Sequence, residues 1–163
     1  MIETERLRLR AFEIEDAEWF FKVTHNDEVR KYLVGAYTRS LNEAKNSIRD
    51  YYSKGDFIHN FYFIIENKEN HERFGFLDIT QGWHKELEVA MFMAKQHRRK
   101  GYMIEALKGF IKYLPAGSVL KFCIEKENES SLIVTQRLEQ IVETTSFCSK
   151  NLTEEFRFFI LET

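Results

Sequence analysis

Two spacings of apolar residues divide this chain into strands and helices. Residues 4–12 alternate arginine with leucine or alanine, and this period of two predicts a strand with one buried face. Residues 103–114 instead repeat apolar residues at the spacing of a helix, and this face comprises Ile104, Leu107, Ile111 and Leu114. The same rules predict further strands over residues 57–66, 72–80, 86–93, 118–125, 141–148 and 155–161.

Polar residues mark the starts of the other predicted helices. Acidic residues at 13–16 begin one helix, and residues 28–33 add another turn or two. A capping-box pattern, Ser-Leu-Asn-Glu, predicts a helix over residues 40–53. Residues 128–131 supply capping residues for a last helix that runs to about residue 139.

The order of these elements predicts an α/β (α+β) fold in one domain that spans residues 1–163. We expect a mixed, largely antiparallel central sheet flanked by about four helices. The strands over 88–93 and 119–125 precede and follow the helix that begins near Met103. They are therefore expected to be parallel neighbours that splay apart beyond Met93.

Composition limits the classes of function. The 24 lysines and arginines are balanced by 26 acidic residues, so a nucleic-acid partner is not expected and any basic function must be local. The 15 phenylalanines predict a bulky core or an apolar cleft. No run is long and apolar enough to cross a membrane, so no membrane partner is expected.

The two cysteines, Cys123 and Cys148, form no CxxC pair and no metal-type cluster. We therefore expect a reducing, cytoplasmic location and no metal site. No base is evident near Cys123, which favours a buried strand thiol over a nucleophile.

The most informative stretch is a basic turn, His97-Arg98-Arg99-Lys100-Gly101, between the strand that ends at Met93 and the next helix. Backbone N–H groups at a helix start lack intrahelical partners, and the helix dipole is positive there. With flanking arginine and lysine these groups predict an anion site suited to a phosphate-bearing ligand. A solvated charge cluster and an RNA-binding turn are the alternatives.

Three stretches together resemble the GNAT acetyltransferases, in particular the branch that acetylates ribosomal-protein N termini and related amines. The first is Ile2-Glu3-Thr4-Glu5-Arg6-Leu7-Arg8-Leu9-Arg10 followed by Glu15-Asp16-Ala17. The second is Arg98-Arg99-Lys100-Gly101-Tyr102-Met103 followed by Glu105-Ala106-Leu107, and the third is Asn128-Glu129-Ser130-Ser131. Met103 departs from the small residue that the family prefers at its position.

The resemblance implies acetyl-CoA as co-substrate and an N-acetyltransferase activity. N–H groups from the basic turn and the helix start would hold the pyrophosphate, and strand N–H groups would face the thioester carbonyl. The expected coenzyme contacts are Met91, Phe92, Met93, Arg98, Arg99, Lys100, Gly101, Tyr102, Met103, Ile104 and Asn128. Capping the following helix is the alternative role for Asn128.

The same resemblance implies two catalytic residues. Glu88 would be the general base that takes a proton from the acceptor ammonium, and an ordinary surface carboxylate is the alternative. Ser131 would donate a hydrogen bond or a proton to the departing thiolate, or would merely occupy the first turn of its helix.

The expected partner is a small-molecule amine or a protein N terminus, and the protein is expected to be a monomer or a homodimer. A non-catalytic acyl-CoA-binding sensor or interaction module is the alternative function. The same residues in the same order suit either function, so the sequence does not separate them.

Overall fold

The computed structural model describes residues 1–82, 85–141, 146–150 and 156–162. Eight strands form one sheet in the order β1-β2-β3-β4-β5-β6-β8-β7. Within it only β5 and β6 pair in parallel, so the predicted mixed, largely antiparallel sheet is confirmed for the described strands. The strands are β1 (Ile2–Glu3), β2 (Leu7–Arg10), β3 (Asn60–Asn67), β4 (Arg73–Gln81), β5 (Leu87–Met93), β6 (Val119–Glu125), β7 (Ser146–Lys150) and β8 (Phe156–Glu162).

Five α-helices are present in the described part of the chain, where the sequence predicted about four. They are α1 (Ala17–Thr24), α2 (Asp27–Tyr32), α3 (Leu41–Asp50), α4 (Tyr102–Tyr113) and α5 (Glu129–Ile141). The additional helix is α2, which is separate from α1 because Asn26 caps it by accepting a hydrogen bond from the Val29 N–H group. Ser40 caps α3 in the same way, as the sequence predicted.

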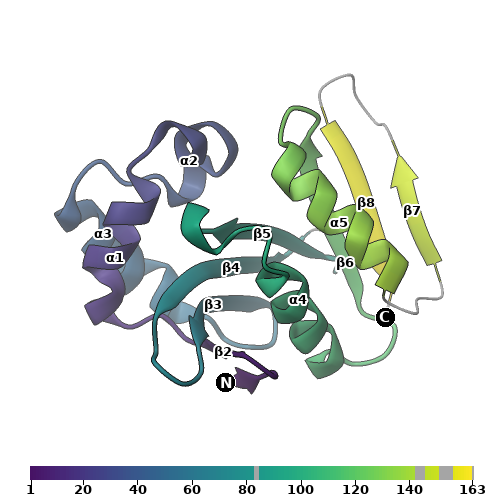
Figure 1. Cartoon of the computed structure of the whole chain (residues 1–163), viewed down its shortest axis with the longest axis horizontal. Coiled ribbons are helices and arrows are strands. Elements are labelled where there is room, and N and C mark those ends of the chain that lie inside the picture. The colour runs from purple at the N-terminus through teal and green to yellow at the C-terminus, as the bar shows by residue number, and fades with distance from the viewer. Residues whose placement is uncertain (83–84, 142–145, 151–155, 163) are drawn as a thin grey trace.

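The helices form two layers, one on each face of the sheet (Figure 1). Neighbouring residues of β4 show the division, because successive side chains of a strand point to opposite faces. Phe76 belongs to the core beneath α1, α2 and α3, whereas Leu77 belongs to the core beneath α4 and α5. The first core contains stacked and edge-on rings, among them Phe12, Phe20 and Tyr52, so the predicted bulky aromatic core is confirmed.

The buried face of α4 differs from the predicted one. The fully buried residues of this helix are Met103, Ala106, Leu107 and Phe110. Ile104 and Ile111 are only half-buried. Phe110 determines this orientation, because its ring packs edge-on against Phe61 with centroids 5.2 Å apart.

The parallel pairing of β5 with β6 is confirmed, but it is shorter than the sequence predicted. It comprises two Cα pairs, Leu87 with Leu120 and Glu88 with Lys121. The strands therefore part from Val89 onward and not beyond Met93. The reason is that β5 stays paired with β4 through Met93, while β6 stays paired with β8 along its whole length.

The N-terminal segment is fastened to the start of α4 by the Glu105 carboxylate. Glu105 Oε1 accepts hydrogen bonds from Thr4 Oγ1 at 2.5 Å and from the Arg6 N–H group at 2.8 Å, and Oε2 accepts from Arg6 Nε at 2.6 Å. The Arg6 guanidinium also donates to the Lys100 carbonyl and lies 4.5 Å from the centre of the Tyr102 ring. Residues from the connection between β1 and β2 thus hold the turn that leads into α4.

Gly75 of β4 allows the close approach of β5. A Cβ atom at this position would lie 2.1 Å from the Phe92 carbonyl oxygen, which is a backbone atom of the paired strand. We predict that Gly75→Ala lowers the free energy of unfolding by at least about 2 kcal/mol. Urea unfolding tests this, with Gly35→Ala as control because nothing lies within 4 Å of its added Cβ. Equal midpoints for wild type and Gly75→Ala would contradict the prediction.

The hydrogen bonds that Glu105 accepts from Thr4 and Arg6, called here the Glu105 clamp, predict that the free energy of unfolding depends on pH. Burial alone raises the pKa of Glu105, but hydrogen bonds from Thr4 and Arg6 outweigh it and lower that pKa. Its contribution is therefore present above the usual carboxyl pKa of about 4.3 and is lost as pH falls through the lowered folded value. We predict that Glu105→Gln costs about 1 kcal/mol at pH 7.

The difference between wild type and Glu105→Gln should narrow on acidification, as measured by urea unfolding from pH 7 to pH 3. Glu3→Gln is the control, since half of the Glu3 side chain is exposed and its pairing with Arg8 is long at 3.3 Å. A difference that stays constant down to pH 3 would show that the carboxylate charge does not hold the segment.

Candidate active site

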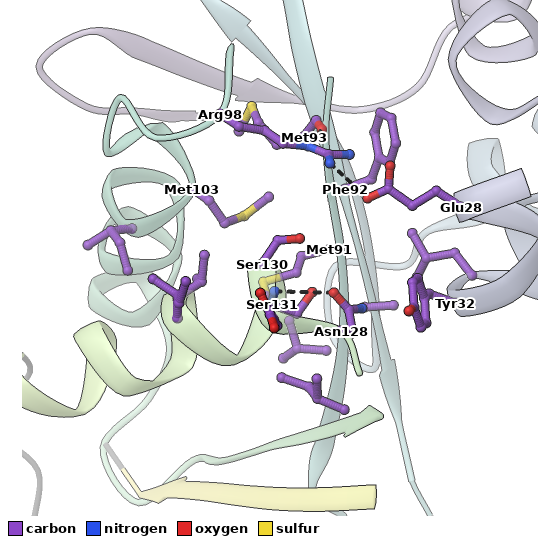
Figure 2. Close-up of a pocket in the computed structure, with 18 of the residues that line it drawn as sticks. Glu28, Tyr32, Met91, Phe92, Met93, Arg98, Met103, Asn128, Ser130 and Ser131 are labelled. Atoms are coloured by element: carbon purple, nitrogen blue, oxygen red, sulfur yellow. Dashed lines mark hydrogen bonds and ion pairs between the residues drawn. The ribbon is translucent and has the colours of Figure 1, made fainter. Parts of the chain in front are cut away.

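The separation of β5 from β6 opens a cleft of about 570 Å³. Its walls are β5, β6, the first turns of α4 and α5, and the inner side of α2 (Figure 2). Ala90 and Phe92 reach it from the face covered by α1 to α3, whereas Met91 and Met93 reach it from the face covered by α4. The cleft therefore connects the two helical layers through the gap in the sheet.

The backbone of β5 presents hydrogen-bonding groups to this cleft. The Ala94 N–H group donates to the Phe74 carbonyl at 2.8 Å, which fixes the alternation of backbone directions along β5. By this alternation Phe92 directs its backbone toward β4, whereas Met91 and Met93 direct theirs toward the gap. Of the three predicted strand donors, Met91 and Met93 thus face the cleft with their N–H groups, and Phe92 contributes its side chain.

The start of α4 is a second source of backbone donors. Gly101 takes a left-handed conformation with φ of 80°, and no side chain caps the helix. The first helical hydrogen bond runs from the Glu105 N–H group to the Gly101 carbonyl, so the N–H groups of residues 102–104 precede the intrahelical ladder. Tyr102, Met103 and Ile104, which the sequence analysis predicted as coenzyme contacts, line the cleft.

The basic turn is less cationic than its sequence suggests. His97 is buried, and its ring stacks on Phe74 with centroids 4.0 Å apart. Burial lowers the pKa of His97, although its Nε2 atom lies 3.1 Å from a Glu72 carboxylate oxygen. This histidine is therefore a largely buried residue that lines the cleft without adding a cation to the turn.

The three cations that follow His97 have different surroundings. Arg98 lines the cleft, but its Nε atom donates to the Met93 carbonyl at 2.8 Å and its Nη1 atom donates to Glu28 at 2.7 Å. Arg99 is exposed, lines the cleft and makes no hydrogen bond or ion pair with the described residues. Lys100 is exposed and lies outside the cleft lining, so Arg99 is the cation available to a ligand there.

The first turn of α5 brings polar groups to the middle of the cleft. Asn128 caps the helix, because its side-chain oxygen accepts a hydrogen bond from the Ser131 N–H group at 3.3 Å. Ser130 and Ser131 lie close to Met91 in Figure 2. The Ser131 hydroxyl has no hydrogen-bond partner among the described residues, which leaves it available to a bound molecule.

Glu88 does not line this cleft. Its side chain is 49% exposed and accepts a hydrogen bond from Lys121 Nζ at 2.7 Å. This cross-strand ion pair lies at the last parallel pair of β5 and β6, where the gap begins. Glu88 lines a second, open hollow with Thr80 and Gly82 on the sheet face that also carries Ala90 and Phe92.

Asp78 is a second carboxyl group on that sheet face. It is opposite Ala90 in the β4–β5 register. Burial raises the pKa of Asp78 to about 6, within the range that suits proton transfer near neutral pH. Nothing in the sequence pattern distinguished Asp78 from other strand residues.

Cys123 differs from the sequence prediction. It was expected to be a buried strand thiol, but it is exposed and lines the cleft. Its place on β6 beyond the last parallel pair accounts for this, because β5 no longer covers it. Partial burial and the charge of Glu88 raise the pKa of the thiol, so at neutral pH it is protonated and a poor nucleophile.

Several cleft residues were missed by the sequence analysis, among them two polar residues of α2. Glu28 and Tyr32 lie one helical turn apart on α2 and both line the cleft (Figure 2). Their i,i+4 spacing is visible in the sequence. It indicates a shared site only once the structure places α2 beside the gap.

The described residues contain no group of three or more His, Cys, Asp or Glu side chains arranged to hold a metal ion. Among the helices described, none has the length and apolar character needed to cross a membrane.

Comparisons with known proteins were made against families, curated proteins and solved structures. A family model for the acetyltransferase (GNAT) domain matches residues 6–139. The uncharacterized N-acetyltransferase YoaA of Bacillus subtilis strain 168 is 27% identical over 116 residues. That match covers 69% of this chain and 65% of the relative, slightly less than two thirds of its length.

Solved structures share the fold at low identity. Spermidine N-acetyltransferase from Vibrio cholerae, in complex with CoA and spermine, superposes with a TM-score of 0.69 at 16% identity, covering 96% of each chain. RimL, a ribosomal L7/L12 α-N-protein acetyltransferase in complex with coenzyme A, gives 0.76 at 12% identity over 96% of this chain and 94% of its own. The family model covers most of the sequence, and the overall fold agrees with these structures. The chain therefore belongs to the GNAT acetyltransferase family.

Proposed function

We propose that this protein transfers the acetyl group of acetyl-CoA to a primary amine by direct attack. One observation carries the proposal: a single cleft connects the uncapped start of α4 with the cleft-facing N–H groups of Met91 and Met93 and with the α2 wall. Phosphate, thioester and acceptor each have a suitable environment along this path.

The start of α4 is the proposed pyrophosphate site. The N–H groups of residues 102–104 and the positive end of the helix dipole favour an anion. Arg99 adds a charge-assisted hydrogen bond, because its guanidinium has no partner in the described chain. The arm of the coenzyme then follows the gap between β5 and β6 past Asn128.

The reaction begins with loss of a proton from the acceptor ammonium. Its lone pair attacks the thioester carbonyl, and the N–H groups of Met91 and Met93 stabilise the oxyanion that forms. When the tetrahedral intermediate collapses, the C–S bond breaks and the coenzyme leaves as a thiolate. The Ser131 hydroxyl donates a hydrogen bond to this thiolate, which takes up the proton that the attacking nitrogen loses as the amide forms.

Glu88 is the proposed base, and in this proposal it acts through intervening water. Its position supports this role, because it is on the strand face of Ala90 and Phe92 at the edge of the gap. Asp78 shares that face, and its raised pKa makes it the competing candidate.

The proposal assigns the acceptor to a chemical class, primary amines, and names no single compound. The names of the solved relatives describe acetylation of spermidine in one case and of a ribosomal protein N terminus in another. Both acceptors are amines, which supports a small-molecule amine or a protein N terminus here. A non-catalytic acyl-CoA-binding module is the alternative, and turnover on an amine panel separates it from an enzyme.

The coenzyme site makes a prediction about Gly101 and Arg99. Proline holds φ near −65°, so Gly101→Pro is incompatible with the observed φ of 80° and should abolish measurable coenzyme A binding. Arg99→Ala should weaken binding by roughly 1–3 kcal/mol through loss of a charged hydrogen bond. Isothermal calorimetry with coenzyme A measures both, and exposed Lys95 outside the cleft gives the control Lys95→Ala. Unchanged affinity in folded Arg99→Ala would contradict the assignment.

The catalytic proposal predicts the effect of Glu88→Gln. Coenzyme affinity should be unchanged, while the rate on a saturating amine should fall by roughly 10²–10⁴-fold. Raising pH should recover part of the loss, since more acceptor is then already deprotonated. Asp78→Asn is the matched comparison on the same strand face. Full activity in Glu88→Gln together with a large loss in Asp78→Asn would assign the proton to Asp78.

A further inference from the structure

The helix α2, which forms the outer wall of the cleft, has little apolar anchorage. It is six residues long, and Val29 is its one buried residue. A helix this short is marginal without tertiary contacts, so polar tethers have a large share in fixing its position. Two ion pairs connect α2 to the opposite side of the cleft.

The two tethers differ in quality. Lys31 pairs with Glu127 at 2.5 Å, but these side chains are 49% and 76% exposed, so solvent screens most of the attraction. Arg98 pairs with Glu28 at 2.7 Å, and these side chains are only 25% and 31% exposed. The Arg98–Glu28 pair is therefore the stronger tether.

Arg98 is also fixed at its other end. Its Nε atom donates to the carbonyl of Met93, the last residue of β5, while its Nη1 atom donates to Glu28 (Figure 2). Turning its guanidinium toward a phosphate would weaken the hydrogen bonds to Met93 and Glu28, and the half-buried Glu28 carboxylate would then lose part of its counter-charge. Arg99, next along the chain, has no such commitment.

We propose that Arg98 is a positioning residue for the acceptor side of the cleft and not a ligand of the coenzyme pyrophosphate. Its ion pair with Glu28 holds α2 against the end of β5, and this sets the distance of Tyr32 and Glu28 from the acyl site. Because Arg98 directly precedes Arg99, the acceptor wall is mechanically connected to the coenzyme turn. The inference rests on the proposed function.

The first experiment measures the tether without any ligand. Hydrogen–deuterium exchange should be followed at the amides of residues 30–33, where Arg30 and Leu33 donate to Asn26 and Val29. Glu28→Gln and Arg98→Ala should each speed this exchange by roughly five- to twentyfold, and α4 should be unaffected. Unchanged exchange in both variants would overturn the tether.

The control is Asp27→Asn, one residue from Glu28 in the same first turn. Asp27 is 90% exposed and pairs with Arg30 on the outer side of the helix. The Asp27→Asn substitution removes the same unit of charge from α2 as Glu28→Gln but lies outside the cleft. Exchange at residues 30–33 in this variant should therefore stay within about twofold of wild type. Equal acceleration in Asp27→Asn would overturn the proposal, because the effect would then come from helix charge alone.

The second experiment separates acceptor from coenzyme. Glu28→Gln and Arg98→Ala should each raise the KM for the acceptor amine roughly five- to twentyfold, and the Kd for coenzyme A by less than about twofold. The double variant should be no worse than either single one, because both remove the same interaction. Arg98→Lys keeps the charge and should recover part of the KM.

One result assigns Arg98 to the phosphate instead. Coenzyme affinity that falls tenfold or more in Arg98→Ala, but not in Glu28→Gln, would overturn the proposal. Absence of coenzyme A binding by the wild type would overturn the proposed function. The exchange measurement needs no ligand, so it tests the Arg98–Glu28 ion pair independently of that outcome.

Discussion

The site depends on one constraint: backbone groups that lose a strand partner need another. β5 and β6 each keep a complete antiparallel neighbour, and they share only two parallel pairs before they part. Beyond Glu88 the inner edge of β5 faces a gap. Met93 satisfies its carbonyl through Arg98, whereas the Met91 carbonyl and both N–H groups remain directed at the cleft. A polar, extended molecule is the natural occupant of such a gap, because it can complete the interrupted ladder.

Because β5 and β6 part, polar groups from both helical layers reach the same cleft. In an uninterrupted sheet the cores beneath α1–α3 and beneath α4–α5 would be sealed from each other. Here the α4 side supplies an uncapped helix start with Arg99 exposed beside it, and the α2 side supplies the carboxylate of Glu28 and the phenol of Tyr32. The polar groups therefore differ along the cleft, with exposed N–H groups and Arg99 at one end and, at the other, Tyr32 and a Glu28 carboxylate that Arg98 already pairs.

Local pattern was enough to predict most of the fold and less of the site. The succession of strands and helices and the glycine at the start of α4 follow from periodicity and capping, which act over a few residues. The parallel neighbours follow from the helical connection between the two strands. Other features depend on tertiary partners. His97 is buried against Phe74, Arg98 donates to Glu28, and the point where β5 and β6 part depends on their other neighbours in the sheet. Charge in a sequence gives the number of cations in a turn, but only packing decides which of them stays available.

The Glu105 clamp has a consequence for the order in which the protein assembles. Thr4 and Arg6 are synthesised well before their partner Glu105, which lies 101 and 99 positions later. Such non-local contacts form late, because closing a long loop costs chain entropy before any contact compensates it. During synthesis the Arg6 guanidinium therefore lacks its Glu105 partner until α4 has been synthesised. The turn at residues 98–101 is then completed by a segment that was synthesised long before it, so this turn reaches its final geometry only after Arg6 has docked on Glu105 and Lys100.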